Sequence, residues 1–391
     1  MVKLNQFKAG GKIKAKTLQG EGYLAFLPEQ INKNFVWDDP KIDLLLAEAY
    51  RWLGELNAYS KLVPDVDYFI ESHVAKEAKQ SSRIEGTMTT MEELYLDKED
   101  LSDDEKVNDQ EEVKNYIQAL NNSVEKLNDP QEPPLSLRTI CHAHKILLSG
   151  VRGYKKNPGV IRKTQNKIGG SQGRLDDAVF IPPTPEYVTP LLDDLEKFWH
   201  TKELHIPDLI KIALAHYQFE TIHPFLDGNG RIGRLIIILQ LISYQILSKP
   251  TLYLSDYFEK NRSAYYDALS RVHESNDIEH WIKFFLVGVA ETAKRGKETL
   301  ENIIDLRKKY EDLIDGGMGI KRGKHGKELL KHLFKKPVIT ANDVEKMISV
   351  TKPTANAIIK EMLIIGILRE KTGMTRNRIY TLHEYLNLFN Q

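Results

Sequence analysis

The 391-residue chain has one cysteine, no long apolar run and no net charge. The single Cys141 excludes an internal disulfide and a cysteine-rich metal cluster. The most apolar stretch, which begins at Leu235, is too short and too interrupted to cross a bilayer and predicts a buried core helix. The first residues contain no apolar segment typical of a secretion signal. We therefore expect a cytoplasmic protein of two or three domains with no membrane partner.

The net charge of zero hides an uneven distribution of charge along the chain. Residues 321–391 contain 14 Lys and Arg and 6 Asp and Glu, a balance of +8, so the first 320 residues carry −8. Part of that negative charge lies in the run DKEDLSDDEKVNDQEEVK at residues 97–114. Such a run is typical of a solvated loop leading into a helix.

Helical periodicity dominates the chain from residue 113 onward. Residues 151–188 interrupt it, because they are rich in glycine and proline with short β-branched patches. This stretch predicts a β-hairpin inserted in a helical domain. The glycines at 316–319 mark the best boundary before the basic C-terminal part.

A dense cluster of polar and glycine residues, HPFLDGNGRIGR, occupies positions 223–234. It lies between IALAHYQFETI and RLIIILQLISYQIL, both of which have the apolar content of buried helices. The cluster therefore predicts a corner between two helices. Gly228 and Gly230 permit backbone conformations that a Cβ would forbid. Their N–H groups, together with the start of the second helix, can bind an anion.

The charged residues of this corner fit a phosphate site. Arg231 and Arg234, three positions apart on one helical face, present planar donor groups to phosphate oxygens. Asp227 fits beside phosphates when a Mg²⁺ ion neutralises it. His223, with an ordinary pKa of about 6.5, suits a general base acting on a hydroxyl. Together they predict a site for phosphoryl or nucleotidyl transfer.

Three other interpretations of the corner compete with phosphate transfer. D-G-N-G is also a common structural turn, and the residues alone leave that alternative open. An EF-hand would use Asp227 and Asn229, but Arg231 and Ile238 at its fifth and twelfth positions exclude it. A zinc site built from His216 and His223 lacks a third ligand at a convincing spacing.

HPFLDGNGRIGR resembles the signature of Fic-domain proteins, HPFx[DE]GNGRxxR, at every fixed position. Most Fic enzymes transfer AMP from ATP to a Ser, Thr or Tyr hydroxyl of a target protein and release pyrophosphate. The resemblance therefore implies a helical core with a β-hairpin flap and a protein adenylyltransferase activity. It also implies ATP as the substrate, Mg²⁺ as the cofactor and an unidentified protein as the target.

The same resemblance implies a role for individual residues. His223 would be the catalytic base, and Asp227 would hold Mg²⁺. Residues 166–183 would form the flap that aligns the target by strand addition, with three residues on the ATP side: Val179, Phe180 and Ile181. The residues implied to contact ATP come from both motifs and from the paired tyrosines of SAYYDAL: Glu85, His223, Gly228, Asn229, Gly230, Arg231, Ile232, Gly233, Arg234, Tyr265 and Tyr266.

A second motif, SSRIEG at residues 81–86, follows an apolar stripe with helical spacing. Gly86 predicts the end of that helix, and we expect Glu85 to continue the stripe on the buried side. A carboxylate at a helix C-terminus opposes the helix dipole and needs a cation nearby. The motif resembles the inhibitory helix of Fic proteins, [ST]xxxE[GN], with Ser81, Glu85 and Gly86 at its fixed positions. By that resemblance Glu85 pairs with Arg234, keeps it from the γ-phosphate and inhibits the enzyme.

Residues 320–391 have the order of elements of a winged helix: three short helices and then two strands around TGMTRN. The side chains of the third helix expected to pack inward are Ala355, Ile358, Met362 and Leu363. Those left for a DNA groove are Lys352, Thr354, Asn356 and Lys360. Arg376 and Arg378 would reach phosphates from the wing. Winged helices also bind proteins or dimerise, so DNA, a protein and a second copy of the chain all stay open as partners.

We therefore expect a mainly α protein in four parts. These are an N-terminal helical region with the inhibitory helix (1–133), a Fic core (134–290), a helical linker (291–319) and a winged-helix domain (320–391). The expected function is an autoinhibited protein adenylyltransferase that also modifies itself. Two alternatives stay open: an enzyme of the same fold that removes AMP from its target, and a DNA-binding regulator whose core senses nucleotide.

Overall fold

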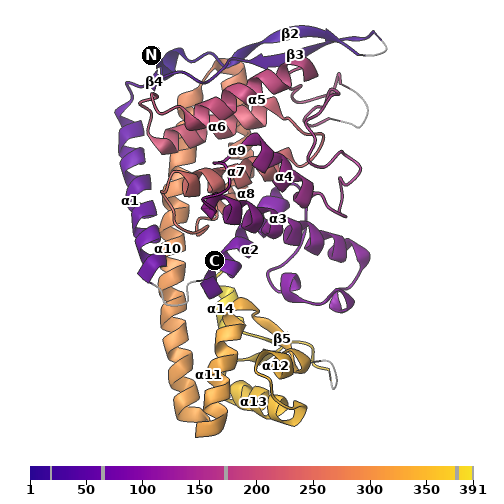
Figure 1. Cartoon of the computed structure of the whole chain (residues 1–391), viewed down its shortest axis with the longest axis vertical. Coiled ribbons are helices and arrows are strands. Elements are labelled where there is room, and N and C mark those ends of the chain that lie inside the picture. The colour runs from indigo at the N-terminus through magenta and orange to yellow at the C-terminus, as the bar shows by residue number, and fades with distance from the viewer. Residues whose placement is uncertain (18–19, 63–66, 171–174, 375–377, 390–391) are drawn as a thin grey trace.

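The computed structural model describes residues 1–17, 20–62, 67–170, 175–374 and 378–389 (Figure 1). Helices dominate, which confirms the mainly α prediction. Figure 1 shows a strand hairpin at one end of the molecule, a helical body in the middle and a small C-terminal domain at the other end. Within the described ranges, no helix is long and apolar enough to cross a membrane.

The first 36 residues contain strands, where we expected part of a helical cap. β1 (Val2–Lys3) pairs in parallel with β4 (Phe35–Val36), and β2 (Gly10–Lys16) pairs in antiparallel register with β3 (Gly22–Pro28). The sequence KIKAK in β2 alternates lysine with apolar residues, and its lysines are exposed. That period of two is the signal of a half-exposed strand, which the helical expectation overlooked.

Two long helices, α1 (Pro40–Leu62) and α10 (Ile278–Gly317), pack side by side along the molecule (Figure 1). α10 has 40 residues without a break. It therefore passes straight through the domain boundary expected between residues 290 and 291. It ends at Gly317, beside the glycines that mark the start of the C-terminal part.

The middle of the molecule is a bundle around two helices that are buried on nearly every side, α6 (Asp208–Ile222) and α7 (Asn229–Ser243). α7 contains the apolar stretch from Leu235, so the prediction of a buried core helix is confirmed. The helices packed around this pair are α3 (Asp104–Asn128), α4 (Leu137–Leu147), α5 (Pro185–His200), α8 (Leu254–Lys260) and α9 (Arg262–Ser275).

Helix α2 (Asp67–Ile84) is unusual because it is polar and yet buried. Its side chains from Ser72 to Ser82 lie inside the molecule, between α3, α8 and the C-terminal part. Buried polar groups are stable only when they are hydrogen-bonded. Glu77 accepts hydrogen bonds from the backbone N–H (3.0 Å) and the hydroxyl of Ser255. Gln80 donates to Asp256 at 2.7 Å.

The C-terminal part contains the three helices predicted from the sequence, α11 (Ile320–Lys335), α12 (Ala341–Met347) and α13 (Lys352–Ile364). They are followed by a short helix, α14 (His383–Asn387). A sheet of order β5-β7-β6 accompanies them, with strands β5 (Val338–Thr340), β6 (Arg369–Glu370) and β7 (Ile379–Thr381).

The inward face of α13 is close to the expected one. Ala355, Ile358 and Met362 are buried, whereas Leu363 is only half-buried. Arg376 lies outside the described residues. The assignment of this domain as a winged helix stays a prediction.

Candidate active site at the helix corner

The twelve-residue motif forms the corner between α6 and α7. α6 ends at Ile222, and His223 turns the chain with φ 49° and ψ 60°, a left-handed conformation. Gly228, at φ 77°, precedes the first residue of α7. A side chain other than glycine would be strained at that angle. The corner thus places the N-terminus of a 15-residue buried helix beside His223.

The Asn229 side chain holds the loop together. Its Oδ1 accepts from the backbone N–H of Phe225 and its Nδ2 donates to the carbonyl of Phe225, both at 2.8 Å. The side chain is therefore used internally, and what Asn229 offers to a ligand is its backbone N–H. The first N–H groups of a helix have no acceptor within that helix, so those of Asn229, Gly230 and Arg231 form an anion cradle.

His144, on α4, orders the Asp227 end of the loop and was missed from the sequence. Its Nδ1 accepts from the Gly159 N–H at 2.7 Å, so its Nε2 carries the proton and donates to the carbonyl of Asp227 at 2.9 Å. The ring stacks on Phe225 at 3.8 Å. Burial lowers the pKa of His144 to about 4, which keeps this ring neutral.

One backbone contact fixes which nitrogen of the His223 ring carries the proton. Its Nδ1 lies 3.3 Å from the carbonyl oxygen of Glu220, which can only accept. The proton therefore sits on Nδ1, and Nε2 keeps its lone pair. Burial, together with the positive charge of Arg162, lowers the pKa of His223 to about 4. The imidazole is thus neutral at physiological pH.

Arg162 fastens the base of the flap to the motif and was also missed from the sequence. Its buried guanidinium donates to the carbonyls of His223 (2.9 Å), Pro183 (2.5 Å) and Ile222 (3.2 Å). Asn166 adds a second donor to the His223 carbonyl at 3.0 Å. Burial lowers the pKa of Arg162 to about 10, so the side chain stays charged.

The flap differs from a regular hairpin in the described part of the chain. A single antiparallel bridge joins Ile168 to Phe180, and residues 171–174 of the expected flap lie outside the described residues. Val179 is 77% exposed, whereas Phe180 stacks on His273 at 4.2 Å. The carbonyl of Ile181 accepts from the Phe26 N–H of β3 at 2.9 Å, so the N-terminal hairpin supports the flap.

Arg234 binds the end of α2. The Nε of its buried guanidinium donates to the Ser81 hydroxyl at 2.9 Å, and Nη2 donates to the Ser81 carbonyl at 2.8 Å. Nη2 also donates to Oε1 of Glu85 at 2.7 Å. Glu85 lies just past the end of α2, and its side chain is 33% exposed, so it does not continue the buried stripe as expected. Gly86, at φ 100°, ends the helix as predicted.

The Glu85 carboxylate lies over the anion cradle. A Cβ built on Gly230 would come 2.3 Å from Glu85 Oε1 and 3.1 Å from an Arg234 nitrogen. Burial by itself would raise the pKa of Glu85, but the positive charges of Arg234 and Arg231 lower it below its ordinary value. The carboxylate is therefore an anion held at the N-terminus of α7.

Arg231 forms a buried ion pair with Glu112, which the sequence analysis placed in a solvated loop leading into a helix. Within residues 97–114, helix α3 begins at Asp104 and buries Glu112. Glu112 Oε2 lies 3.2 Å from Arg231 and accepts from the Thr87 hydroxyl at 2.7 Å. The expectation for this run is corrected at Glu112, because the acid faces a buried arginine.

Of the other residues expected to contact ATP, some lie in the core and one lies at the surface. Tyr265 is buried and its hydroxyl lies 2.8 Å from His216 Nε2, so it packs as a core residue. Tyr266 is 40% exposed. Ile232 is buried, and a Cβ on Gly233 would lie 2.1 Å from a Glu220 oxygen. Close packing between α6 and α7 therefore explains why an apolar side chain stands at Ile232 and a glycine at Gly233.

Comparisons with known proteins agree with this corner. Residues 44–125 match the Fic/DOC family N-terminal region and residues 134–241 match the Fic/DOC family. The chain is a Fic domain protein.

Relatives of this Fic protein are similar to a part of the chain. The protein adenylyltransferases Fic of Drosophila grimshawi and Drosophila melanogaster are 29% and 30% identical over 157 and 159 residues. Each match covers 39% of this chain and 28% of the relative, so it spans less than a third of each relative's length. A Fic family protein from Desulfovibrio desulfuricans shares the fold with a TM-score of 0.56 at 19% identity, over 89% of this chain and 98% of that one.

Glu220 is a further acid of this Fic protein, half-buried and one turn before His223. Within the described residues its Oε1 has no hydrogen-bond partner. Burial raises the pKa of Glu220 to about 7; Arg234 opposes the rise and the negative Glu85 adds to it. The sequence carried a signal for this site, an acid inside the apolar helix IALAHYQFETI.

We expect Glu220→Gln to change the pH dependence of stability. Because the folded pKa is about 7 and the ordinary value is 4.5, the folded protein binds more protons than the unfolded chain between these values. Stability from this group is therefore lost as pH rises through that window. Relative to wild type, Glu220→Gln should gain on the order of 1–3 kcal/mol between pH 5 and pH 8, measured by urea unfolding. The exposed Glu274→Gln is the control, and equal shifts in both variants would contradict the assignment.

Proposed function

We propose that this Fic domain protein is a protein adenylyltransferase that moves AMP from ATP to a Ser, Thr or Tyr hydroxyl of a target protein or of itself, and that Glu85 inhibits it. The observation that carries the proposal is the corner itself. A neutral histidine, a helix N-terminus and Arg234 meet at one corner of the chain, and the Glu85 carboxylate lies against Gly230 and Arg234 there. The adenylyltransferase names of the relatives support the same reaction.

The geometry accounts for each part of the transfer. The first amides of α7 and the Arg234 guanidinium would bind the triphosphate. The target hydroxyl oxygen attacks the α-phosphorus, while the bond from that phosphorus to the oxygen bridging the β-phosphate breaks. Pyrophosphate leaves, and the hydroxyl proton moves to Nε2 of His223.

Asp227 is the residue that would hold Mg²⁺. The described residues contain no group of three or more His, Cys, Asp or Glu side chains that could hold a metal. In nucleotide sites Mg²⁺ is held by one or two carboxylates together with substrate phosphates, so a single acid fits an ion that arrives with ATP. Asp227 is 36% exposed and its Oδ1 accepts from the Gly228 N–H at 2.6 Å. When bound there, the ion would neutralise negative charge on the triphosphate.

Inhibition follows from competition between two anions. Glu85 and the γ-phosphate of ATP would both use Arg234, and Glu85 also lies against Gly230 in the anion cradle. While Glu85 is in place, a triphosphate cannot take up the full set of contacts. ATP would then bind in a pose that does not suit in-line attack.

Removing the carboxylate should activate the enzyme. We expect Glu85→Gly to raise self-modification at least about tenfold, because breaking this partly buried ion pair frees Arg234. The measurement is label transfer from α-labelled ATP, together with intact mass for a gain of one AMP. The double variant Glu85→Gly/His223→Ala is the matched control and should lose transfer while still binding ATP. Transfer that is unchanged by Glu85→Gly would overturn the inhibition, and no transfer by any variant would overturn the enzyme.

The low pKa of His223 predicts a flat pH profile. A base with an ordinary pKa of 6.5 would lose about fourfold of its neutral form between pH 7.5 and pH 6.0. With a pKa of about 4, His223 stays neutral through that range. Transfer by Glu85→Gly at saturating ATP should therefore fall by less than about twofold. A fall of fourfold or more with a midpoint near 6.5 would contradict the assigned environment.

A second activity, binding to duplex DNA, is favoured by the exposed side of α13. Lys352, Asn356 and Lys360 are exposed there, and residues 321–391 carry a balance of +8. Side chains on one face of such a helix can reach the major groove, and the charge favours phosphates.

The double variant Lys352→Glu/Lys360→Glu should weaken binding to duplex DNA at least about tenfold and reduce the salt dependence. Lys202→Glu, an exposed lysine at the opposite end of the molecule, is the control for added negative charge. Binding that does not change with salt concentration would remove DNA as a partner.

A further inference from the structure

We propose that the C-terminal domain acts as a clamp on the inhibitory helix, holding α2 in the position from which Glu85 reaches Arg234. The proposal rests on the inhibitory role of Glu85 proposed above. It adds that displacement of the C-terminal domain releases the enzyme. The contacts that carry it lie at both ends of the inhibitory segment, before Ser81 and after Gly86.

The first set of contacts lies at residues 71–73 of α2. Helix α11 packs against α2, and Lys335 at its end lies 3.1 Å from Glu71. Phe389, which follows α14, meets the His73 ring edge-on with centroids 5.2 Å apart. Both rings are buried, so this contact is part of the core and not a surface touch.

Ser72, which lies between Glu71 and His73, is also close to the C-terminal domain. The Ser72 hydroxyl lies 3.2 Å from the Tyr95 hydroxyl, and burial raises the pKa of the neighbouring Tyr385 hydroxyl. Tyr385 belongs to α14 and its hydroxyl donates to the carbonyl of Phe334 at the end of α11. Glu71 and His73 of α2 are therefore contacted by α11 and by the residue that follows α14, and Tyr385 of α14 lies close to Ser72 between them.

A further contact lies beyond the inhibitory motif. Lys371, next to β6, forms an ion pair with Glu92, six residues after Gly86. Glu92 lies in the segment that begins with Thr87. The Thr87 hydroxyl donates to Glu112, which pairs with Arg231. The C-terminal domain thus holds the chain on both sides of Ser81 and Glu85.

Helix α2 is a stiff connection between the clamp and the active site. From His73 to Glu85 the helix advances by about 18 Å, at 1.5 Å per residue. A helix transmits a shift at one end to the other because its backbone hydrogen bonds keep its length fixed. A movement of α2 of one or two ångströms is enough to separate a charge pair held at 2.7 Å.

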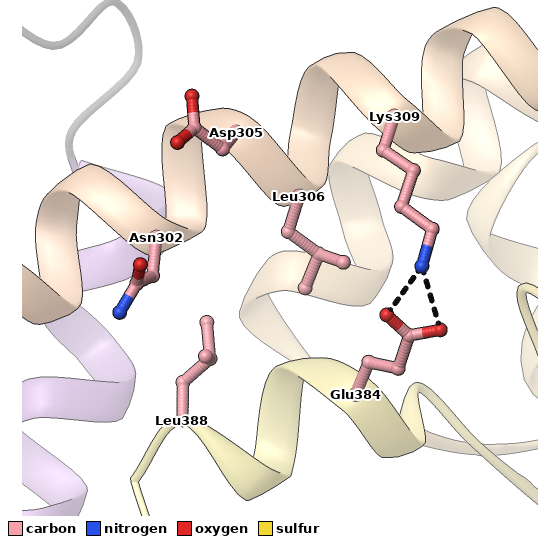
Figure 2. Close-up of a pocket in the computed structure, with 6 residues that line it drawn as sticks. All are labelled: Asn302, Asp305, Leu306, Lys309, Glu384 and Leu388. Atoms are coloured by element: carbon pink, nitrogen blue, oxygen red, sulfur yellow. Dashed lines mark hydrogen bonds and ion pairs between the residues drawn. The ribbon is translucent and has the colours of Figure 1, made fainter.

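A groove separates part of the C-terminal domain from α10. Figure 2 shows the seam between α10 and α14, where Lys309 bridges to both carboxylate oxygens of Glu384 at 2.7 and 3.0 Å. Leu306 and Leu388 line the same seam, which leaves an open groove of about 360 Å³. α14 is therefore not packed tightly against α10, and Phe389 is the residue directly after Leu388.

The middle of α2 is also tied to α8 by Gln80, which donates to Asp256 at 2.7 Å. The C-terminal domain is consequently one of several supports of α2, and loosening it should activate the enzyme only in part. Residues that couple two sites change the coupling by an amount equivalent to about two- to thirtyfold.

The experiment compares Phe389→Ala in two backgrounds of the full-length protein. Alone, it should raise self-modification from α-labelled ATP by about two- to thirtyfold. Combined with Glu85→Gly it should add nothing, because there is no carboxylate left to release. Deuterium exchange of the amides of residues 72–86 should rise in Phe389→Ala, a readout that does not depend on activity.

A charge exchange provides a variant that keeps the core intact. Lys335→Glu should also raise self-modification, and Lys335→Glu/Glu71→Lys should bring it back toward wild type. Lys331→Glu, exposed on the same helix, is the matched control. If Glu85→Gly is active but neither Phe389→Ala nor Lys335→Glu changes transfer or exchange, the clamp is wrong. If Glu85→Gly is inactive while exchange still rises, the proposed function fails and the mechanical link remains.

Discussion

The guanidinium of Arg234 is the constraint on which the rest of the site depends. It is buried at the start of α7, and a buried cation without partners costs several kcal/mol. Ser81 and Glu85 meet this need with three hydrogen bonds, although they lie about 150 residues earlier in the chain. This requirement fixes the end of α2 against the start of α7.

The helix dipoles favour the same arrangement. The C-terminus of α2 carries partial negative charge and the N-terminus of α7 carries partial positive charge, so their meeting is favourable. Glu85 at the end of α2 would be unfavourable on an isolated helix, but here it faces the amides of α7. The carboxylate that is out of place in its own helix thus fits the neighbouring one. A phosphate fits there for the same reason, which is why the two would exclude each other.

Local sequence predicted the corner because its determinants are local. Gly228 needs a positive φ, and the flanking helices are apolar enough to be recognised as buried. The pairing of Glu85 with Arg234 came from family resemblance and was not visible in either motif alone. Arg162, His144 and Glu112 were missed because each acts through contacts across the fold, 119 residues in the case of Glu112 and Arg231. In a helix such as α3, periodicity separates one face from another, but it cannot say that one acid on that face meets an arginine.

The polar character of α2 explains how the proposed inhibitory helix can be fixed in one position and still be displaced. An apolar helix packs against many surfaces with similar energy and can slide or rotate between them. Buried polar groups such as Glu77 and Gln80 are satisfied only in one register, because each partner must be at hydrogen-bonding distance. Shifting α2 by one residue would turn Glu85 by about 100° away from Arg234 and leave several buried groups unpaired. The helix therefore has one position in which Glu85 meets Arg234, and the groups that define it are spread over α3, α8 and the C-terminal domain.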